Sequence, residues 1–319
     1  MRLIGQPEDM LVTVTLNPSL DRTLSVPELH PGKLHRARLL RVDLSGKGVN
    51  ISRALQALGL PSLIVCFAGG QTGRLLRDGL SSAGFAVSFI EIPDEIRQNI
   101  TLLDESTGQY TKINEPGPPI TPGHITALED LVEHTVQPGD LWAFCGSLPP
   151  DAPSDLYTRL ITRIQSRQAL AFLDSSRSPL REGLRANPFA LKINSEEAGE
   201  LLGGSLEDDQ AILDAASQLQ AGGIHLVVIT RGAQGLVLVT SSAAVIATPP
   251  PVVAHSPIGA GDATLAGLLW SVTDQCDPRT TARRAVACGT AAAMQPGTAM
   301  GNRALIQDLL PKINIREGK

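Results

Sequence analysis

Short runs of aliphatic and β-branched residues recur along the chain, and most of them are followed by a turn and an amphipathic stretch. The first run, residues 11–16, ends at Asn17-Pro18-Ser19, which is typical of a buried strand that stops at a turn. Comparable strands are predicted over residues 62–68, 141–145, 169–173, 189–193, 224–230 and 235–240.

Helical periodicity falls between most of these strands. In residues 49–58, Ile51, Ala54, Leu55 and Leu58 recur at helical spacing just before Gly59, and helices are also predicted over 153–167 and 206–221. Strands that alternate with helices favour βαβ units. The pattern therefore predicts an α/β fold with a mostly parallel central sheet and helices on both faces.

Two segments interrupt this rhythm. Polar and apolar residues alternate from Arg22 to Asp43, and residues 99–115 resemble a hairpin around a turn at 105–108. Together they predict a small second sheet, or lid, that stands off the main one. Residues 116–122 contain four prolines and are interpreted as a linker or hinge.

Composition restricts the class of protein. The 319 residues are 42% hydrophobic, 18% charged and only 3% aromatic, as expected for one globular domain, residues 1–319, whose core is mostly aliphatic. The net charge of −5 gives no general attraction to nucleic acid or to anionic membranes. Any anionic ligand must therefore be bound locally.

The ends of the chain and its cysteines predict a cytoplasmic protein. There is no secretory leader pattern and no uninterrupted apolar run of about 18 residues. The four cysteines show no metal-binding spacing, so they are interpreted as reduced thiols in the core. Met10 directly precedes the first strand, which leaves the true start open, and residues 1–9 are given no function.

The strongest local signal for chemistry is a turn of small residues, 256–262, before an apolar helix. Such a turn exposes backbone N–H groups at the positive end of the helix dipole, which is an anion site. Two interpretations of Asp262 fit this position. It is either the N-cap of the helix or a general base beside an anion hole made by Gly259, Ala260 and Gly261.

With this motif the sequence resembles the ribokinase-like PfkB family of carbohydrate kinases, whose C-terminal signature centres on Gly-Ala-Gly-Asp. Three further segments match the family in order: 45–50 (Ser-Gly-Lys-Gly-Val-Asn), 194–197 (Asn-Ser-Glu-Glu) and 230–235 (Thr-Arg-Gly-Ala-Gln-Gly). Each motif alone is weak. The ordered set, from residue 11 to about 298, is specific.

Within the family, segments 15–21 and 145–150 look like the branch that phosphorylates ketohexose phosphates, which includes 1-phosphofructokinases, tagatose-6-phosphate kinases and minor 6-phosphofructokinases. Ser256 stands where many members have Asp, so a requirement for a monovalent cation stays open, and Ser45 replaces the first glycine of the N-terminal signature. The resemblance implies an ATP- and Mg²⁺-dependent kinase. The expected reaction converts fructose 1-phosphate to fructose 1,6-bisphosphate.

The resemblance also implies roles for particular residues. Asp262 is expected to deprotonate the sugar hydroxyl, and the amides of Gly259–Gly261 to stabilise the transferred phosphoryl group. Other residues are expected to bind the sugar phosphate: Asp21, Gly46, Lys47, Asn50, Arg97, Gly146 and Ser147. The nucleotide is expected to contact Lys192, Asn194, Thr230, Gly232 and Gly235, with Glu197 holding the metal ion through water.

Simpler structural roles stay open for several of these residues. Asp21 could stabilise a turn, Asn194 and Glu197 could form a capping box, Gly146 and Ser147 could form an ordinary turn, and a lone Lys47 or Arg97 could be a solvated surface residue.

Other protein classes fit less well. The chain lacks the P-loop pattern, the dinucleotide-binding glycine pattern, a Gly-x-Ser-x-Gly elbow and His-Glu-x-x-His spacing. Three alternatives remain: a tagatose-6-phosphate kinase or 6-phosphofructokinase of the same branch, a ribokinase or nucleoside kinase, and a non-catalytic sugar-phosphate sensor. The resemblance implies three partners: a phosphorylated ketohexose, ATP and a second copy of the chain, paired through the lid.

Overall fold

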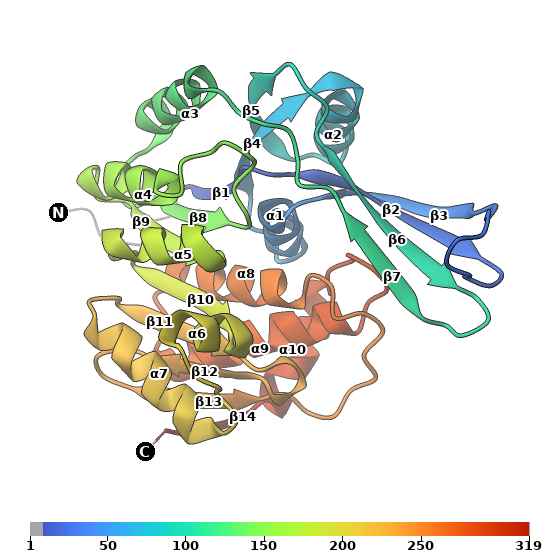
Figure 1. The fold of residues 1–319 in the computed structure, drawn as a ribbon. Coiled ribbons are helices and arrows are strands. Elements are labelled where there is room, and N and C mark those ends of the chain that lie inside the picture. Colours follow the sequence, from blue (N-terminus) through green and yellow to red (C-terminus); the bar gives the residue numbers. More distant parts are fainter. Residues whose placement is uncertain (1–8, 319) are drawn as a thin grey trace.

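The computed structural model describes residues 9–318, so residues 1–8, which were given no function, lie outside the described part. Ten strands form one large twisted sheet through the middle of the molecule (Figure 1). In spatial order they are β14 (Asn314–Glu317), β13 (Ala244–Thr248), β12 (Leu236–Val239), β11 (Leu226–Thr230), β10 (Ala190–Asn194), β9 (Leu170–Asp174), β8 (Leu141–Cys145), β1 (Leu11–Thr15), β4 (Ser62–Gly69) and β5 (Ala86–Ile92).

The seven strands from β11 to β5 are parallel, which confirms the predicted α/β sheet. The run at 235–240 was expected to continue the alternation of strands and helices, but β12 is antiparallel to β11. Only a short 3₁₀ turn, Gly232–Gln234, joins these two strands. Because a parallel connection needs a crossover of a dozen residues or more, the chain can only turn back here.

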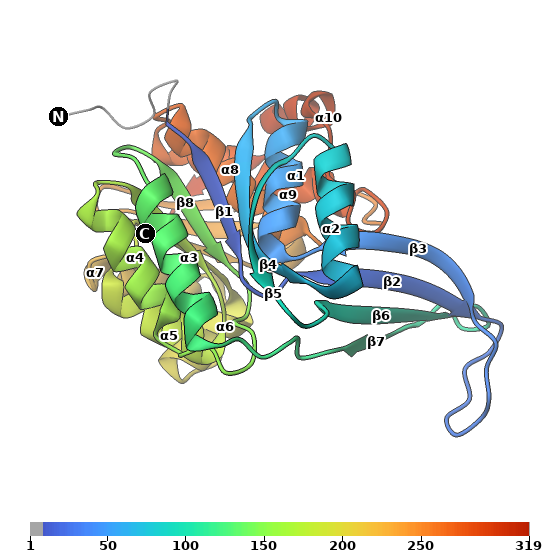
Figure 2. The same cartoon turned by 90° about the horizontal axis from the view of Figure 1, so that it is seen from above.

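Helices cover both faces of the large sheet, as predicted (Figure 2). One face packs against α3 (Pro122–Thr135), α4 (Leu156–Ser166), α5 (Arg177–Gly183), α6 (Ser195–Leu202) and α7 (Asp209–Ala221). The other packs against α1 (Lys47–Ala57), α2 (Gly70–Ser82), α8 (Ala260–Thr273), α9 (Pro278–Ala293) and α10 (Arg303–Leu309).

The predicted helix boundaries differ from the observed ones by a few residues. The helix predicted over 206–221 begins at Asp209, because the side chain of Asp208 accepts a hydrogen bond from the backbone N–H of Ala211 and caps the helix there. Within residues 9–318, none of the helices has the length and apolar character needed to cross a membrane.

A second, four-stranded sheet projects from the body of the molecule (Figures 1 and 2). Its strands lie in the order β3 (Arg38–Ser45), β2 (Ser19–Val26), β6 (Arg97–Asp104) and β7 (Tyr110–Asn114). They come from the two segments in which a small separate sheet was predicted, and β6 and β7 form the expected hairpin. We call this the small sheet.

Candidate active site

The candidate residues gather at the carboxyl ends of the parallel strands. Thr15, Cys145 and Asp174 are the last residues of β1, β8 and β9 and are aligned with one another, as are Asn194 and Thr230 at the ends of β10 and β11. The strand order reverses at β1, whose neighbours β4 and β8 lie far apart in the sequence. Ligands of open α/β sheets bind at such a reversal.

The turn of small residues forms the N-terminus of α8. Gly259 is the N-cap, with a φ of 80°, and Asp262 is the third residue of the helix. The N-cap interpretation of Asp262 is therefore wrong, since its carboxylate accepts a hydrogen bond from Nδ2 of Asn50 at 2.8 Å instead of capping the helix. The first-turn N–H groups of α8 have no acceptor within the helix, and that of Ala260 donates to the carbonyl oxygen of Pro257 at 3.4 Å. The N–H groups of Gly261 and Asp262 can therefore face an anion.

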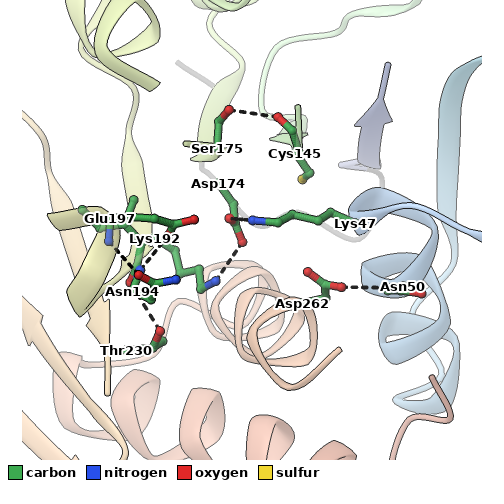
Figure 3. Close-up of polar contacts among 12 residues, drawn as sticks. Lys47, Asn50, Cys145, Asp174, Ser175, Lys192, Asn194, Glu197, Thr230 and Asp262 are labelled. Atoms are coloured by element: carbon green, nitrogen blue, oxygen red, sulfur yellow. Dashed lines mark hydrogen bonds and ion pairs between the residues drawn. The ribbon is translucent and has the colours of Figure 1, made fainter. Parts of the chain in front are cut away.

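Asp262 is held in a nearly closed environment between α8 and α1. It is only 7% exposed, and Figure 3 shows its carboxylate directed toward Asn50. Oδ1 of Asn50 in turn accepts a hydrogen bond from Arg53 at 3.1 Å, which fixes the orientation of the amide. Burial raises the pKa of Asp262 above its ordinary value, although the positive charge of Lys47 opposes this shift. A carboxylate with a raised pKa is better suited to accept a proton.

An aspartate that the sequence analysis missed lies at the centre of the site. Asp174 is fully buried and forms ion pairs with Lys47 at 2.5 Å and Lys192 at 2.9 Å (Figure 3). Burial alone would raise the pKa of Asp174, but the two ammonium groups outweigh it and lower the pKa below its ordinary value. For Lys47, burial disfavours the charged form, yet attraction to Asp174 and Asp262 raises its pKa. The charged forms of Asp174 and Lys47 therefore persist at neutral pH.

Lys192 lies beside the predicted anion hole. A Cβ built on Gly261 would be only 2.8 Å from Nζ of this lysine, so the absence of a side chain at Gly261 allows the ammonium group to approach the start of α8. The same group is one of the two partners of Asp174. One buried carboxylate thus positions two cations, one beside the helix N-terminus and the other, Lys47, at the wall of a neighbouring cavity.

That cavity, of about 250 Å³, is lined by two cationic residues, one carboxylate and otherwise small or neutral polar residues, and we call it the cationic cavity. They are Thr15, Asn17, Lys47, Arg97, Cys145, Gly146, Ser147, Ser176 and Glu197. Lys47 and Arg97, from α1 and the small sheet, are brought together here. The surface interpretation of Lys47 is wrong, since its ammonium is paired with a buried aspartate.

Gly146 and Ser147 line the same cavity, but their backbones differ from the expectation. The N–H of Gly146 donates to the carbonyl oxygen of Asp174 at 2.9 Å, so it is not available to a ligand as predicted. Oγ of Ser147 accepts a hydrogen bond from Asn17 at 3.3 Å, and its own proton remains for a ligand.

Asp21 lies on β2, within a strand, so its interpretation as a turn residue is wrong. Its carboxylate accepts hydrogen bonds from Ser19 and Asn99, each at 2.8 Å. Among the described residues, the lining of the 250 Å³ cavity includes Arg97 of the small sheet but not Asp21. The structure therefore does not bring Asp21 into this cavity.

A larger cavity of about 630 Å³ lies on the other side of the α8 N-terminus. Thr230, Gly232 and Gly235 line one wall, Ala260 and Gly261 another, and Pro249–Val252 a third. The predicted nucleotide loop and the predicted anion hole therefore share one cavity, although they are separate segments of the sequence.

Asn194 and Glu197 form the capping box that the simpler interpretation predicts. Oε2 of Glu197 accepts from the N–H of Asn194 at 2.9 Å, and Oδ1 of Asn194 accepts from the N–H of Glu197 at 2.7 Å. Glu197 nevertheless lines the cationic cavity. Among residues 9–318 there is no cluster of three metal-ligating side chains, so a metal ion here would take most of its ligands from water and a bound anion.

The sequence contains a pattern from which Asp174 could have been identified as a candidate site residue. Asp174 directly follows the apolar run 169–173, and a polar residue at the carboxyl end of a predicted parallel strand lies at the edge where ligands bind. Arg53, three residues after Asn50 and on the same helix face, is another residue that the sequence analysis did not single out.

Comparison with known proteins assigns this architecture to a class. A family model described as pfkB family carbohydrate kinase matches residues 14–304. The chain belongs to the pfkB family, and it is a carbohydrate kinase, a phosphotransferase that acts on an alcohol group.

The individual proteins that this chain is similar to include several phosphofructokinases. The 1-phosphofructokinase of Vibrio cholerae serotype O1 is 31% identical over 305 residues, which cover 96% of each chain. The 1-phosphofructokinase of Rhodobacter capsulatus is 33% identical over 278 residues, 87% of this chain and 88% of that one. The crystal structure of phosphofructokinase-2 from Escherichia coli in complex with potassium matches with a TM-score of 0.91 at 28% identity, over 95% of this chain and 98% of that one.

Proposed function

We propose that this kinase transfers the terminal phosphoryl group of ATP to a ketohexose phosphate, with fructose 1-phosphate as the preferred substrate and fructose 1,6-bisphosphate as the product. One observation carries the proposal: Lys47, whose charge interacts with the buried Asp262, lines a small cavity together with Arg97. A cationic cavity suits a substrate that already carries a phosphate. The relatives named 1-phosphofructokinase support the same substrate class.

In the proposed reaction Asp262 accepts the proton of the sugar 6-hydroxyl, whose oxygen attacks the terminal phosphorus of ATP while ADP leaves. The N–H groups at Gly259–Gly261 stabilise the negative charge of the transferred group. The hydrogen bond from Asn50 keeps the carboxylate of Asp262 oriented. Positioning and charge neutralisation supply most of the rate, because the transferred group is loosely bonded in the transition state.

The nucleotide is assigned to the larger cavity. Its lining combines the glycine-containing turn Gly232–Gln234, which allows close backbone approach, with the start of α8. Mg²⁺ fits an oxygen donor set of few carboxylates, and Glu197 offers a second carboxylate oxygen beyond the one in the capping box. The ion would neutralise charge on the phosphates, and Lys192 would do the same from the protein side.

The small sheet is proposed to close over the sugar. One of its faces carries Asp21 and Asn99, which are aligned in β2 and β6. The opposite face carries Val42, Arg22, Ile100 and Ile113, which are aligned across β3, β2, β6 and β7. Closure would bring Asp21 to the sugar hydroxyls and exclude water from the site.

This second face of the small sheet, in which aliphatic side chains flank Arg22, is proposed to pair with the same face of a second copy. Val42 and Ile113, which lie on the two edge strands β3 and β7, are 47% and 55% exposed. Val42→Asp is expected to shift the sedimentation coefficient from dimer to monomer at micromolar concentration. A parent protein that already sediments as a monomer would contradict the pairing.

The proposed reaction is tested with Asp262→Asn and a coupled assay of ADP release. The panel contains fructose 1-phosphate, fructose 6-phosphate, tagatose 6-phosphate, fructose, ribose and adenosine. The parent is expected to prefer fructose 1-phosphate. The variant is expected to lose roughly 10²-fold or more in kcat, because a general base usually contributes at least that much to the rate. It should still bind ATP.

The matched control is Asp308→Asn, which removes an exposed aspartate on α10 that pairs with the equally exposed Lys312. It should retain parent activity. Near-normal turnover of Asp262→Asn would refute the assignment of the base, and preference of the parent for ribose, fructose or adenosine would refute the substrate class.

A further inference from the structure

Asn17 lines the cationic cavity and lies where three other segments of the chain meet. Asn17 lies shortly after the end of β1 and is only 6% exposed. Its Nδ2 donates to the carbonyl oxygen of Pro116 at 2.9 Å and to Oγ of Ser147 at 3.3 Å. Its backbone carbonyl oxygen accepts a hydrogen bond from Nε of Arg97 at 3.1 Å. One residue thus contacts the linker, the loop after β8 and the small sheet.

Gly117 packs against the oxygen atom of the Asn17 side-chain amide. A Cβ built on Gly117 would collide with Oδ1 of Asn17, because the two atoms would be closer than such atoms can approach. Among the described residues, this oxygen is buried and has no hydrogen-bond partner. Leaving a buried acceptor unpaired costs free energy. Asn17 and Gly117 therefore pack closely although the unpaired oxygen of Asn17 destabilises the folded state.

Pro116 and Gly117 belong to the segment that carries the chain from β7 back to α3 (Figure 2). If the small sheet moves, this segment must move with it or act as its hinge. Asn17 contacts this segment at two points: it donates a hydrogen bond to Pro116 and packs against Gly117. The same amide contacts Ser147, which lines the cationic cavity.

We propose that Asn17 is a positioning residue that fixes the return segment of the small sheet against the cationic cavity, so that affinity for the phosphate of the sugar depends on it. The inference rests on the proposed sugar-phosphate site. It extends that site to the Asn17–Gly117 contact, which neither binds the nucleotide nor touches the transferred group.

The test compares Asn17→Ala and Gly117→Ala with a matched control, Gly108→Ala. Gly117 and Gly108 both have positive φ, 98° and 71°, and both lie on or beside the small sheet, but a Cβ at Gly108 would meet nothing within 4 Å. The control therefore carries the backbone strain of alanine without the collision.

We expect both test variants to raise KM for fructose 1-phosphate about tenfold, which is the loss expected for one or two hydrogen bonds. KM for ATP should stay within about twofold, a change of less than 1 kcal/mol in binding free energy. Gly108→Ala should change neither KM, although the backbone strain should lower its urea midpoint. The collision with Asn17 should lower the urea midpoint of Gly117→Ala further. These changes separate a role in positioning from a general loss of stability.

The double variant Asn17→Ala/Gly117→Ala gives the sharpest result. Once the amide of Asn17 is removed, the new Cβ at position 117 has nothing there to collide with. KM for the sugar phosphate should therefore stay near that of Asn17→Ala alone and not rise about 100-fold, as independent effects would require. Multiplicative effects, an unchanged KM in Asn17→Ala, or equal changes for both substrates would overturn the inference. A parent enzyme that rejects ketohexose phosphates would instead overturn the proposed function.

Discussion

The buried ion pairs of Asp174 make the strongest prediction for mutagenesis. Asp174→Asn keeps the size of the side chain but removes the charge that holds Lys47 and Lys192. Removing one partner of a buried pair costs about 3–5 kcal/mol, because an uncompensated charge is left behind. The side chain of Lys47 is 33% exposed and can turn to water, whereas that of Lys192 is only 6% exposed. We therefore expect the lower end of that range, about 3 kcal/mol.

The assay is urea unfolding followed by circular dichroism, together with steady-state kinetics. A loss of about 3 kcal/mol leaves a domain of ordinary stability folded at 25 °C, so kinetics can be measured on the same variant. KM should rise for both substrates, since Lys47 lines the cationic cavity and Lys192 lies beside Gly261 in the proposed anion hole.

Asp308→Asn again serves as the control, because exposed pairs contribute at most about 1 kcal/mol. The reasoning would be refuted by an Asp174→Asn variant that loses less than about 1 kcal/mol and keeps both KM values. A rise in only one KM would show that the carboxylate positions one lysine and not both.

Three further predictions follow from other contacts. Arg97→Ala should raise KM for the sugar phosphate far more than KM for ATP, because Arg97 lines the smaller cavity and not the larger one; steady-state kinetics with each substrate varied in turn would contradict this if both KM values rose equally. Hydrogen bonds from the side chain and backbone of Thr72 lower the pKa of Glu95 from 4.5 to about 2, so Glu95 stabilises the fold above pH 4.5 and loses this effect as the pH falls toward 2. Glu95→Gln should accordingly lower the urea midpoint at pH 7 and differ less from the parent at pH 3, and a constant difference would argue against this role. Gly297→Ala should displace the guanidinium of Arg41, with which a Cβ built there would collide, and raise KM for the sugar by disturbing the small sheet; Gly108→Ala, with similar φ and open space, should not.

Much of the fold could be predicted because periodicity is a local property. The strands at 141–145 and 62–69 and the helix that begins near Gly48 follow from runs and spacings that the chain carries in a single stretch. The antiparallel edge, β12–β14, could not be predicted in this way. Strand direction depends on the length of the connection and on which edge is free to pair.

The candidate site shows the same division. Asp262 and the small residues before it could be identified from one turn, and Lys47 from the two glycines that flank it. Asp174 could not be given a role, because nothing near it in the sequence indicates the two lysines, 127 and 18 residues away, that it holds.

The sequence by itself determined the layered α/β class, the separate small sheet and the glycine turn that begins α8, since each depends on neighbours a few residues apart. Only the tertiary structure decided that Asp262 faces Asn50 and does not cap its helix. It also decided that one buried carboxylate holds Lys47 and Lys192 together, and that Asn17 packs against Gly117. The physical reason is that burial and charge pairing arise between strands and helices that meet only when the sheet has formed, so no single stretch of the chain contains them.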